Sequence, residues 1–211
     1  MQKLFKIIGQ SAALIAISTF LSTAFAAGDA TQGASKAATC VACHGVNGNS
    51  VNPAWPSLAG QHEAYIVKTL QAFKQPNGAE GGRYDVVMSG QAIPLSEQDM
   101  ADIGAFFADQ KMAGKVADPD LVAAGERLYQ GGDKENNISA CIACHGPGGR
   151  GNAPAGYPSV AGQHATYTTK QLSDYRSGAR KSDNGEIMRS ISARLTDDEI
   201  KAVSAYIQGL R

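Results

Sequence analysis

Two stretches of the chain share a pattern in which large apolar and aromatic side chains fall on one face of a helix. The first contains Tyr65, Leu70 and Phe73, and the second contains Tyr167, Leu172 and Tyr175. Such spacing predicts a helix with one buried face. Because the second stretch repeats the first after 102 residues, we expect the same helix to occur twice.

A further pair of helices is predicted after Ser96 and Thr196. Each of these residues offers a hydroxyl to the free N–H groups of a helix start, and an acidic residue follows three positions later, which is the capping-box pattern. Apolar residues then recur at helical spacing, as Met100, Ile103 and Phe107 in the first half and as Ile200, Val203 and Ile207 in the second. The buried stripe of this last helix is therefore repeated as well.

Each half also has an expected first helix, which begins at Asp29 or at Asp118. Aspartate accepts hydrogen bonds from the free N–H groups at a helix start, and Pro119 suits the first turn of the second helix. The second half carries extra residues around 131–137, rich in Gly, Asp and Asn, which indicate a surface loop. No segment predicts a strand, so the expected fold class is all-α.

Gly33 and Gly125 fall inside the two first helices. A glycine inside a helix costs about 1 kcal/mol relative to alanine. We therefore expect both glycines to permit close helix contact, with Gly104 and Ser204 of the last helices facing them.

The repeat extends to the loops and indicates two similar domains. The sequence Pro-Ser-Leu-Ala-Gly-Gln-His at 56–62 returns as Pro-Ser-Val-Ala-Gly-Gln-His at 158–164. A period near 100 residues is too long for one unit of a solenoid. We predict tandem domains at 27–114 and 120–211, joined by a linker at 115–119.

The first residues have the pattern of a secretory leader. Lys3 and Lys6 precede an apolar run, and Ala24-Phe25-Ala26 supplies the small residues that a signal peptidase recognises. The alternative is a membrane anchor, but the run is short for a span, which needs about 20 residues. We expect residues 1–26 to be a signal peptide and the mature protein to be periplasmic.

The composition narrows the classes of function. With 19 basic and 19 acidic residues, the chain has no excess positive charge of the kind that attracts nucleic acid. Four cysteines in an exported protein would ordinarily suggest disulfide bonds. Here, however, the cysteines form two close pairs, and a histidine follows each pair directly.

The two cysteine pairs predict covalently attached haem. They are Cys40, Cys43 and His44 in the first half, and Cys141, Cys144 and His145 in the second. Two cysteines at this spacing can each form a thioether with one haem vinyl group, and the next histidine then reaches the iron. A thioredoxin-like CxxC would need a βαβ setting, and a four-cysteine zinc site would not need a histidine after both pairs. We therefore expect two haem c groups.

Methionine is the expected sixth ligand of each iron. Met88 and Met188 are equivalent, because each lies seven residues before a matched leucine. Met100 corresponds to an isoleucine, and Met112 has no counterpart. Ordinary core packing is the alternative for the matched pair. With histidine and methionine on each iron, both irons would be closed and suited to electron transfer.

His62 and His164 are also equivalent and offer the alternative of two histidines on each iron. Each starts a predicted helix, where a polar residue is ordinary. The ligating histidines, in turn, are expected to donate their Nδ1–H to a backbone carbonyl. Carbonyls in the loops 53–56 and 154–158 are the candidates.

The sequence resembles the di-haem cytochrome c4 family in four features taken together. These are the leader, two CxxCH motifs about 100 residues apart, the repeated Pro-Ser-[Leu/Val]-Ala-Gly-Gln loops, and a late methionine in each half. The resemblance covers residues 27–211. It implies two class I cytochrome c domains related by pseudo-twofold symmetry, with His44 and Met88 on one iron and His145 and Met188 on the other. It also implies a periplasmic carrier between the quinol-oxidising complex and a terminal haem-copper oxidase, at times loosely associated with the membrane. We expect a monomer.

Two other functions compete with a free carrier. One is the electron-accepting di-haem subunit of a dehydrogenase, such as a flavoprotein sulfide dehydrogenase. The other is a di-haem enzyme of the peroxidase or thiosulfate-oxidising kind, which needs an open iron or a reactive cysteine. All four cysteines are assigned to haem attachment and both irons have a matched methionine. We therefore expect an electron-transfer protein rather than an enzyme.

Basic residues gather in sequence around Met188. They are Arg176, Arg180, Lys181, Arg189 and Arg194. One hypothesis is an exposed patch that steers an acidic partner to the second haem, and the alternative is an ordinary solvated loop.

Overall fold

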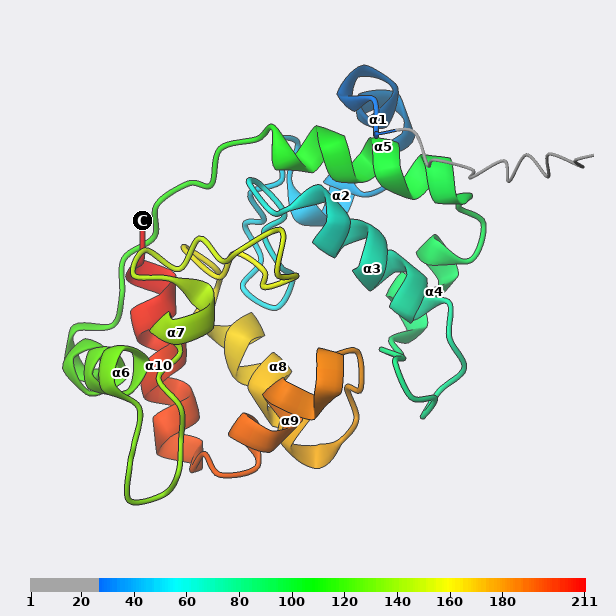
Figure 1. Cartoon of the computed structure of the whole chain (residues 1–211). Coiled ribbons are helices and arrows are strands. Elements are labelled where there is room, and N and C mark those ends of the chain that lie inside the picture. Colours follow the sequence, from blue (N-terminus) through cyan, green and yellow to red (C-terminus); the bar gives the residue numbers. More distant parts are fainter. Residues whose placement is uncertain (1–26) are drawn as a thin grey trace, which may run out of the picture.

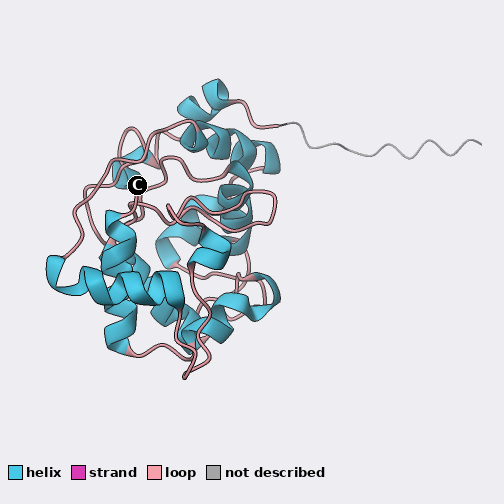
Figure 2. Cartoon of the chain, turned by 60° about the vertical axis from the view of Figure 1, so that its left-hand side comes forward, coloured by secondary structure: helices cyan, strands magenta, loops and turns pink. Residues whose placement is uncertain are grey.

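The computed structural model describes residues 27–211, so the predicted leader lies outside the described residues. The described part of the chain consists of helices and loops, with three isolated β-bridges and no strand (Figure 2). The helices of the first half are α1 (Ala30–Lys36), α2 (Val41–His44), α3 (Glu63–Phe73), α4 (Val86–Ala92) and α5 (Glu97–Ala108). Those of the second half are α6 (Pro119–Gly131), α7 (Ile142–His145), α8 (Ala165–Ser177), the short 3-10 helix η1 (Asn184–Glu186), α9 (Ile187–Ser192) and α10 (Asp197–Gly209). The predicted all-α class is confirmed.

The two halves place equivalent helices in equivalent positions. Figure 1 shows α1 to α5 gathered in one unit and α6 to α10 in the other, with the linker passing between them. In each unit the first helix packs on the last, and the middle helix packs on the last as well. None of the described helices is long and apolar enough to cross a membrane.

The helix starts follow the capping residues in the sequence. Asp29 and Asp118 accept hydrogen bonds from backbone N–H groups in the first turns of α1 and α6, and Pro119 stands at the first position of α6. Ser96 and Thr196 begin α5 and α10 with complete capping boxes. Each of these predictions is confirmed, because a cap depends only on residues within one helical turn.

The two glycines inside the first helices bring helix pairs into close contact. A Cβ atom on Gly33 would lie 1.9 Å from the carbonyl oxygen of Asp102 in α5. A Cβ atom on Gly125 would lie 2.1 Å from the carbonyl oxygen of Ala202 in α10. Backbone thus packs directly on backbone at both crossings, and only glycine leaves enough room.

The predicted partners of these glycines were wrong. Gly104 faces Glu63 of α3 instead, with its Cβ position 3.0 Å from Glu63 Cγ. Ser204 is fully buried in α10, but the backbone at Ala202 is what meets Gly125. The close contact lies about half a turn away from the expected position, because helical periodicity does not give the rotation of one helix against another.

Each unit has its own hydrophobic core. The first is formed by Ala37, Ile66, Leu70, Phe73, Ala92, Met100, Ile103 and Phe107. The second is formed by Leu128, Tyr129, Ile138, Leu172, Leu195, Ile200, Val203 and Ile207. The predicted buried stripes of α5 and α10 lie in these cores. The loop at 131–137 is largely exposed, as its composition indicated.

Reciprocal hydrogen bonds join the two units. Gln163 donates to the carbonyl oxygen of Ser57 at 2.8 Å and accepts from its N–H at 2.9 Å. Gln61 makes the same two contacts with Ser159, at 2.8 and 3.0 Å. Because each glutamine reaches across to the serine that follows the other unit's proline, the contacts obey an approximate twofold axis.

Candidate functional site

The two CxxCH motifs form short helical turns. Cys40 precedes α2 and its carbonyl oxygen accepts from the N–H of His44 at 2.9 Å; Cys141 and His145 repeat this contact at 2.9 Å. The turn ends at a glycine in each unit, which has a φ of 85° or 74°. Only glycine adopts such backbone angles readily. The chain can therefore turn away at once while both cysteines and the histidine remain on one turn.

A backbone carbonyl orients each of these histidines. His44 Nδ1 lies 2.7 Å from the carbonyl oxygen of Pro56, and His145 Nδ1 lies 2.9 Å from that of Pro158. A carbonyl only accepts, so Nδ1 carries the proton and Nε2 keeps its lone pair. Burial lowers the pKa of both imidazoles, which keeps them neutral. The predicted carbonyl acceptors are confirmed.

The matched methionines lie near the cysteines of their own unit. Met88 on α4 packs against the first core together with Cys40, and Met188 on α9 packs against the second core together with Cys141. Asp85 caps α4 and accepts from the N–H of Met88 at 3.0 Å, which holds the backbone at this position. In each unit the matched methionine and the CxxCH turn thus contact the same core.

The other matched histidines are placed differently from each other. His62 and His164 begin α3 and α8. His164 is buried, and its Nε2 lies 2.8 Å from the carbonyl oxygen of Ser50 in the other unit. The Nε2 of His62 is buried without a hydrogen-bond partner in the described structure. The His164 ring is therefore engaged across the boundary between the units.

Arg180 was expected at the surface, and this prediction was wrong. It is buried at the boundary between the units, with 5% of its surface exposed. Its guanidinium donates to Tyr65 Oη at 2.9 Å and to Gln171 Oε1 at 2.9 Å. It also lies 4.5 Å from the centre of the Tyr175 ring. The basic stretch of sequence around Arg180 did not indicate that its side chain contacts the first unit.

Arg83 takes the matching place in the first unit. Its guanidinium donates to Gln171 Oε1 at 2.7 Å and to Tyr167 Oη, and lies 4.8 Å from the centre of the Phe73 ring. A short antiparallel bridge joins the backbones of Arg83 and Arg180. Each arginine thus stacks on an aromatic ring of its own unit and bonds to a tyrosine of the other.

The two guanidiniums have no acidic partner in the described residues, since no carboxylate oxygen lies within 4.0 Å of either. A buried charge without a counter-charge is costly. The two positive charges change the pKa of the neighbouring Tyr65 phenol. Burial alone would raise the pKa of Tyr65, but the charges of Arg180 and Arg83 lower it to about 8.

Two of the other basic residues near Met188 form ion pairs. Arg189 bonds to Asp183 at 2.8 Å and to Glu80 of the first unit, and Arg176 bonds to Asp197 at 2.5 Å. Lys181 and Arg194 donate to backbone carbonyl oxygens instead. With Arg180 buried and two members paired with acids, these residues do not support the hypothesis of one exposed basic patch.

These features fit haem c. The four cysteines are free of disulfide bonds and partly buried, so their sulfurs are available for thioethers. No group of three or more His, Cys, Asp or Glu side chains converges within residues 27–211. A neutral Nε2 with its lone pair suits iron. The two uncompensated arginines suit the haem propionates, which are carboxylates.

Comparison with known proteins supports the same assignment. The Cytochrome c family model matches residues 30–111 and again residues 122–211. Cytochrome c4 of Azotobacter vinelandii is 51% identical over 192 residues, which are 89% of this chain and 91% of that protein. The crystal structure of reduced recombinant cytochrome c4 from Pseudomonas stutzeri aligns with a TM-score of 0.83 and 48% identity, covering 88% of this chain and 100% of that one.

A relative with a different name also matches. The thiosulfate dehydrogenase electron acceptor of Thiomonas intermedia is 38% identical over 177 residues, which are 82% of this chain and 78% of that protein. The duplicated match, with a CxxCH motif in each copy, shows two covalently bound haem c groups and a role in electron transfer. Two equivalent helical units, each holding one such motif over its own core, place this chain in the di-haem cytochrome c4 family.

Proposed function

We propose that this chain is a periplasmic carrier that takes electrons from the quinol-oxidising respiratory complex and delivers them to a terminal haem-copper oxidase. We further propose that His44 and Met88 would bind one iron, and that His145 and Met188 would bind the other. The observation that carries the proposal is the repeated placement of a methionine and a CxxCH turn against one core. When bound, each haem supplies a one-electron iron couple.

The residues of the chain act by holding the ligands in place. Pro56 and Pro158 orient the two histidines through Nδ1, which leaves the Nε2 lone pair of each free to bind the iron when haem is present. Asp85 fixes the start of the helix that carries Met88. Ligands held in this way need little rearrangement when the charge on the metal changes. This favours electron transfer and disfavours substrate binding, in line with a carrier that catalyses no reaction of its own.

Arg83 and Arg180 are the residues that we assign to the haem propionates. Both guanidinium groups lie at the boundary between the units, and each donates a hydrogen bond to a tyrosine of the opposite unit. Carboxylates supplied by the cofactor would balance both charges. Attachment of haem would then also strengthen the contact between the two units.

Several expectations from the sequence stand as part of this proposal. The leader 1–26 is removed after export, the units divide at a linker at 115–119, and the mature protein is a monomer with at most loose membrane association. Mass spectrometry of the purified protein tests the cleavage after Ala26. Cross-linking or analytical ultracentrifugation tests the monomer.

Potentiometric titration followed at the methionine–iron charge-transfer band tests the ligands. We expect the band in both oxidised haems and no carbon monoxide binding by the reduced native protein. Met88→Ala should remove the band from one haem only and open that iron to carbon monoxide. Two histidines on each iron in the native protein would contradict the assignment.

A second candidate function is favoured by one observation. The similarity to the thiosulfate dehydrogenase electron acceptor suggests that this chain accepts electrons from a dehydrogenase. Stopped-flow reduction by the isolated quinol-oxidising complex, compared with reduction by a thiosulfate dehydrogenase, separates the two donors. Co-purification with a catalytic chain would favour the dehydrogenase.

A further inference from the structure

The contacts between the two units are not fully symmetric. The reciprocal glutamine and serine contacts described above exist on both sides of the approximate twofold axis. Among the contacts that exist on one side only, two reach the loop that follows His44. They come from Lys115 of the linker and from His164 of the second unit.

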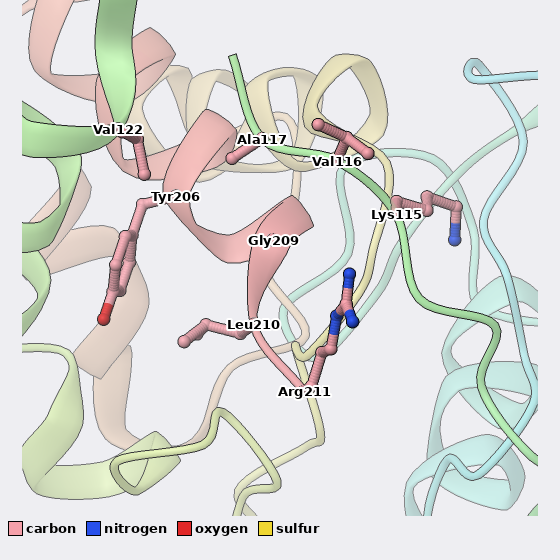
Figure 3. Close-up of a pocket in the computed structure, with 8 residues that line it drawn as sticks. All are labelled: Lys115, Val116, Ala117, Val122, Tyr206, Gly209, Leu210 and Arg211. Atoms are coloured by element: carbon pink, nitrogen blue, oxygen red, sulfur yellow. The ribbon is translucent and has the colours of Figure 1, made fainter. Parts of the chain in front are cut away.

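Lys115 places its ammonium group between the two units. Its Nζ lies 2.6 Å from the carbonyl oxygen of Gly162 and 3.2 Å from Ser57 Oγ. Lys115 is also one of the residues that line the hollow beside the end of α10 (Figure 3). The residue is partly buried, and no carboxylate lies within 4.0 Å of Nζ in the described structure.

The position of this charge differs for the two histidines. Ser57 directly follows Pro56, whose carbonyl oxygen orients His44. In the second unit the contacted residue, Gly162, lies four residues beyond the orienting Pro158. The serine equivalent to Ser57 bonds instead to the carbonyl oxygen of Gly149, at 3.4 Å, and receives no lysine. Of the two residues that the ammonium contacts, only Ser57 adjoins a proline whose carbonyl oxygen orients a CxxCH histidine.

His164 adds a neutral contact to the same loop. Its Nε2 donates to the carbonyl oxygen of Ser50, whose hydroxyl in turn donates to the carbonyl oxygen of Cys43 at 3.0 Å. The equivalent His62 Nε2 has no such partner. The loop that follows His44 thus has two contacts that the equivalent loop of the second unit lacks, and one of them carries a charge.

We infer that Lys115 is a positioning residue that raises the reduction potential of the haem attached at Cys40 and Cys43 more than that of the second haem. Reduction removes one positive charge from the iron. A fixed cation nearby repels the oxidised state more than the reduced state, and this effect is strong where water is partly excluded. A single lysine in the linker, which has no counterpart in the repeat, would thereby contribute to a difference in potential between the two haems.

The experiment compares the two midpoint potentials in variants of the complete di-haem protein. Lys115→Gln keeps a hydrogen-bond donor but removes the charge, and Lys115→Arg keeps the charge. Lys111→Met is the matched control, because Lys111 is an exposed lysine of the same segment. Signals of the individual haems in NMR spectra at intermediate degrees of reduction assign each potential to its haem.

We expect Lys115→Gln to lower the potential of the first haem and to change that of the second less, while Lys115→Arg and Lys111→Met leave both close to native. Equal shifts of both haems, or no shift, would overturn the inference. His164→Gln provides the second measurement, since it alters the other contact to the loop without changing the charge. If it changed the first potential as much as Lys115→Gln, loop position rather than charge would be the cause, and the inference would be wrong.

Discussion

Replacing Gly33 with alanine is expected to push α1 away from α5. A Cβ atom at this position would lie 1.9 Å from the Asp102 carbonyl oxygen and 2.8 Å from Phe106 Cβ. Real Cβ atoms essentially never approach another atom closer than 3.0 Å, so the helices must separate by about 1 Å. The obstacle is backbone, which cannot rotate aside as a flexible side chain would.

The size of the effect follows from two opposing contributions. Overpacking of a tight contact costs about 1–3 kcal/mol. Alanine favours a helix over glycine by about 1 kcal/mol. Because rigid backbone blocks the new methyl group, we expect the upper part of the range and a net loss of about 1–2 kcal/mol in the free energy of unfolding. In a domain of this size, 1 kcal/mol lowers Tm by about 4–8 °C.

Thermal unfolding followed by far-ultraviolet circular dichroism measures this loss. Gly125→Ala should behave in the same way, because its Cβ position is 2.1 Å from the Ala202 carbonyl oxygen. Gly131→Ala in α6 is the matched control, since nothing lies within 4 Å of its Cβ position, and it should be neutral or stabilising. The reasoning is refuted if Gly33→Ala is as stable as the native protein, or if Gly131→Ala is destabilised equally.

Three further results are expected. The pKa of Asp102 is lowered to about 2, first by the N–H of Asp29 and then by Lys36, whereas an unfolded aspartate titrates near about 4. Its contribution to stability is therefore complete above about pH 4 and is lost as the pH falls toward 2, so acid unfolding of Asp102→Asn should vary less with pH over this interval. Gln163→Ala should lower the free energy of unfolding by about 1–3 kcal/mol, because the buried N–H and carbonyl groups of Ser57 lose their partner. Denaturant unfolding measures this loss, and a native-like midpoint would contradict the prediction. Met188→Ala should open only the second iron to carbon monoxide, and binding at both irons would show that the ligands are shared or misassigned.

The local structure of this chain, such as where its helices begin, could be predicted from its sequence. Helix starts at Asp29, Asp118, Ser96 and Thr196 depend on hydrogen bonds that span three residues, so sequence was sufficient. The CxxCH turns are equally local. The repeat then transferred each assignment from one half to the other, which is why Met88 and Met188 could be singled out before their packing was known.

Contacts across the boundary between the units had no such local signal. Arg180 stands among other basic residues in the sequence, yet the fold buries it against Tyr65, 115 residues away. Gly33 indicated a close contact but not its partner, because helical periodicity leaves the rotation between two helices undetermined.

The difference between the two haem sites was decided by tertiary structure alone. The sequence determined two similar units, each with its own CxxCH motif, because cysteine spacing and helix periodicity act within a unit. The linker lysine Lys115 and the ring of His164 both reach the loop beside His44. The docking of one unit on the other selects which loop they meet, since a single linker cannot obey the twofold symmetry of the units that it joins.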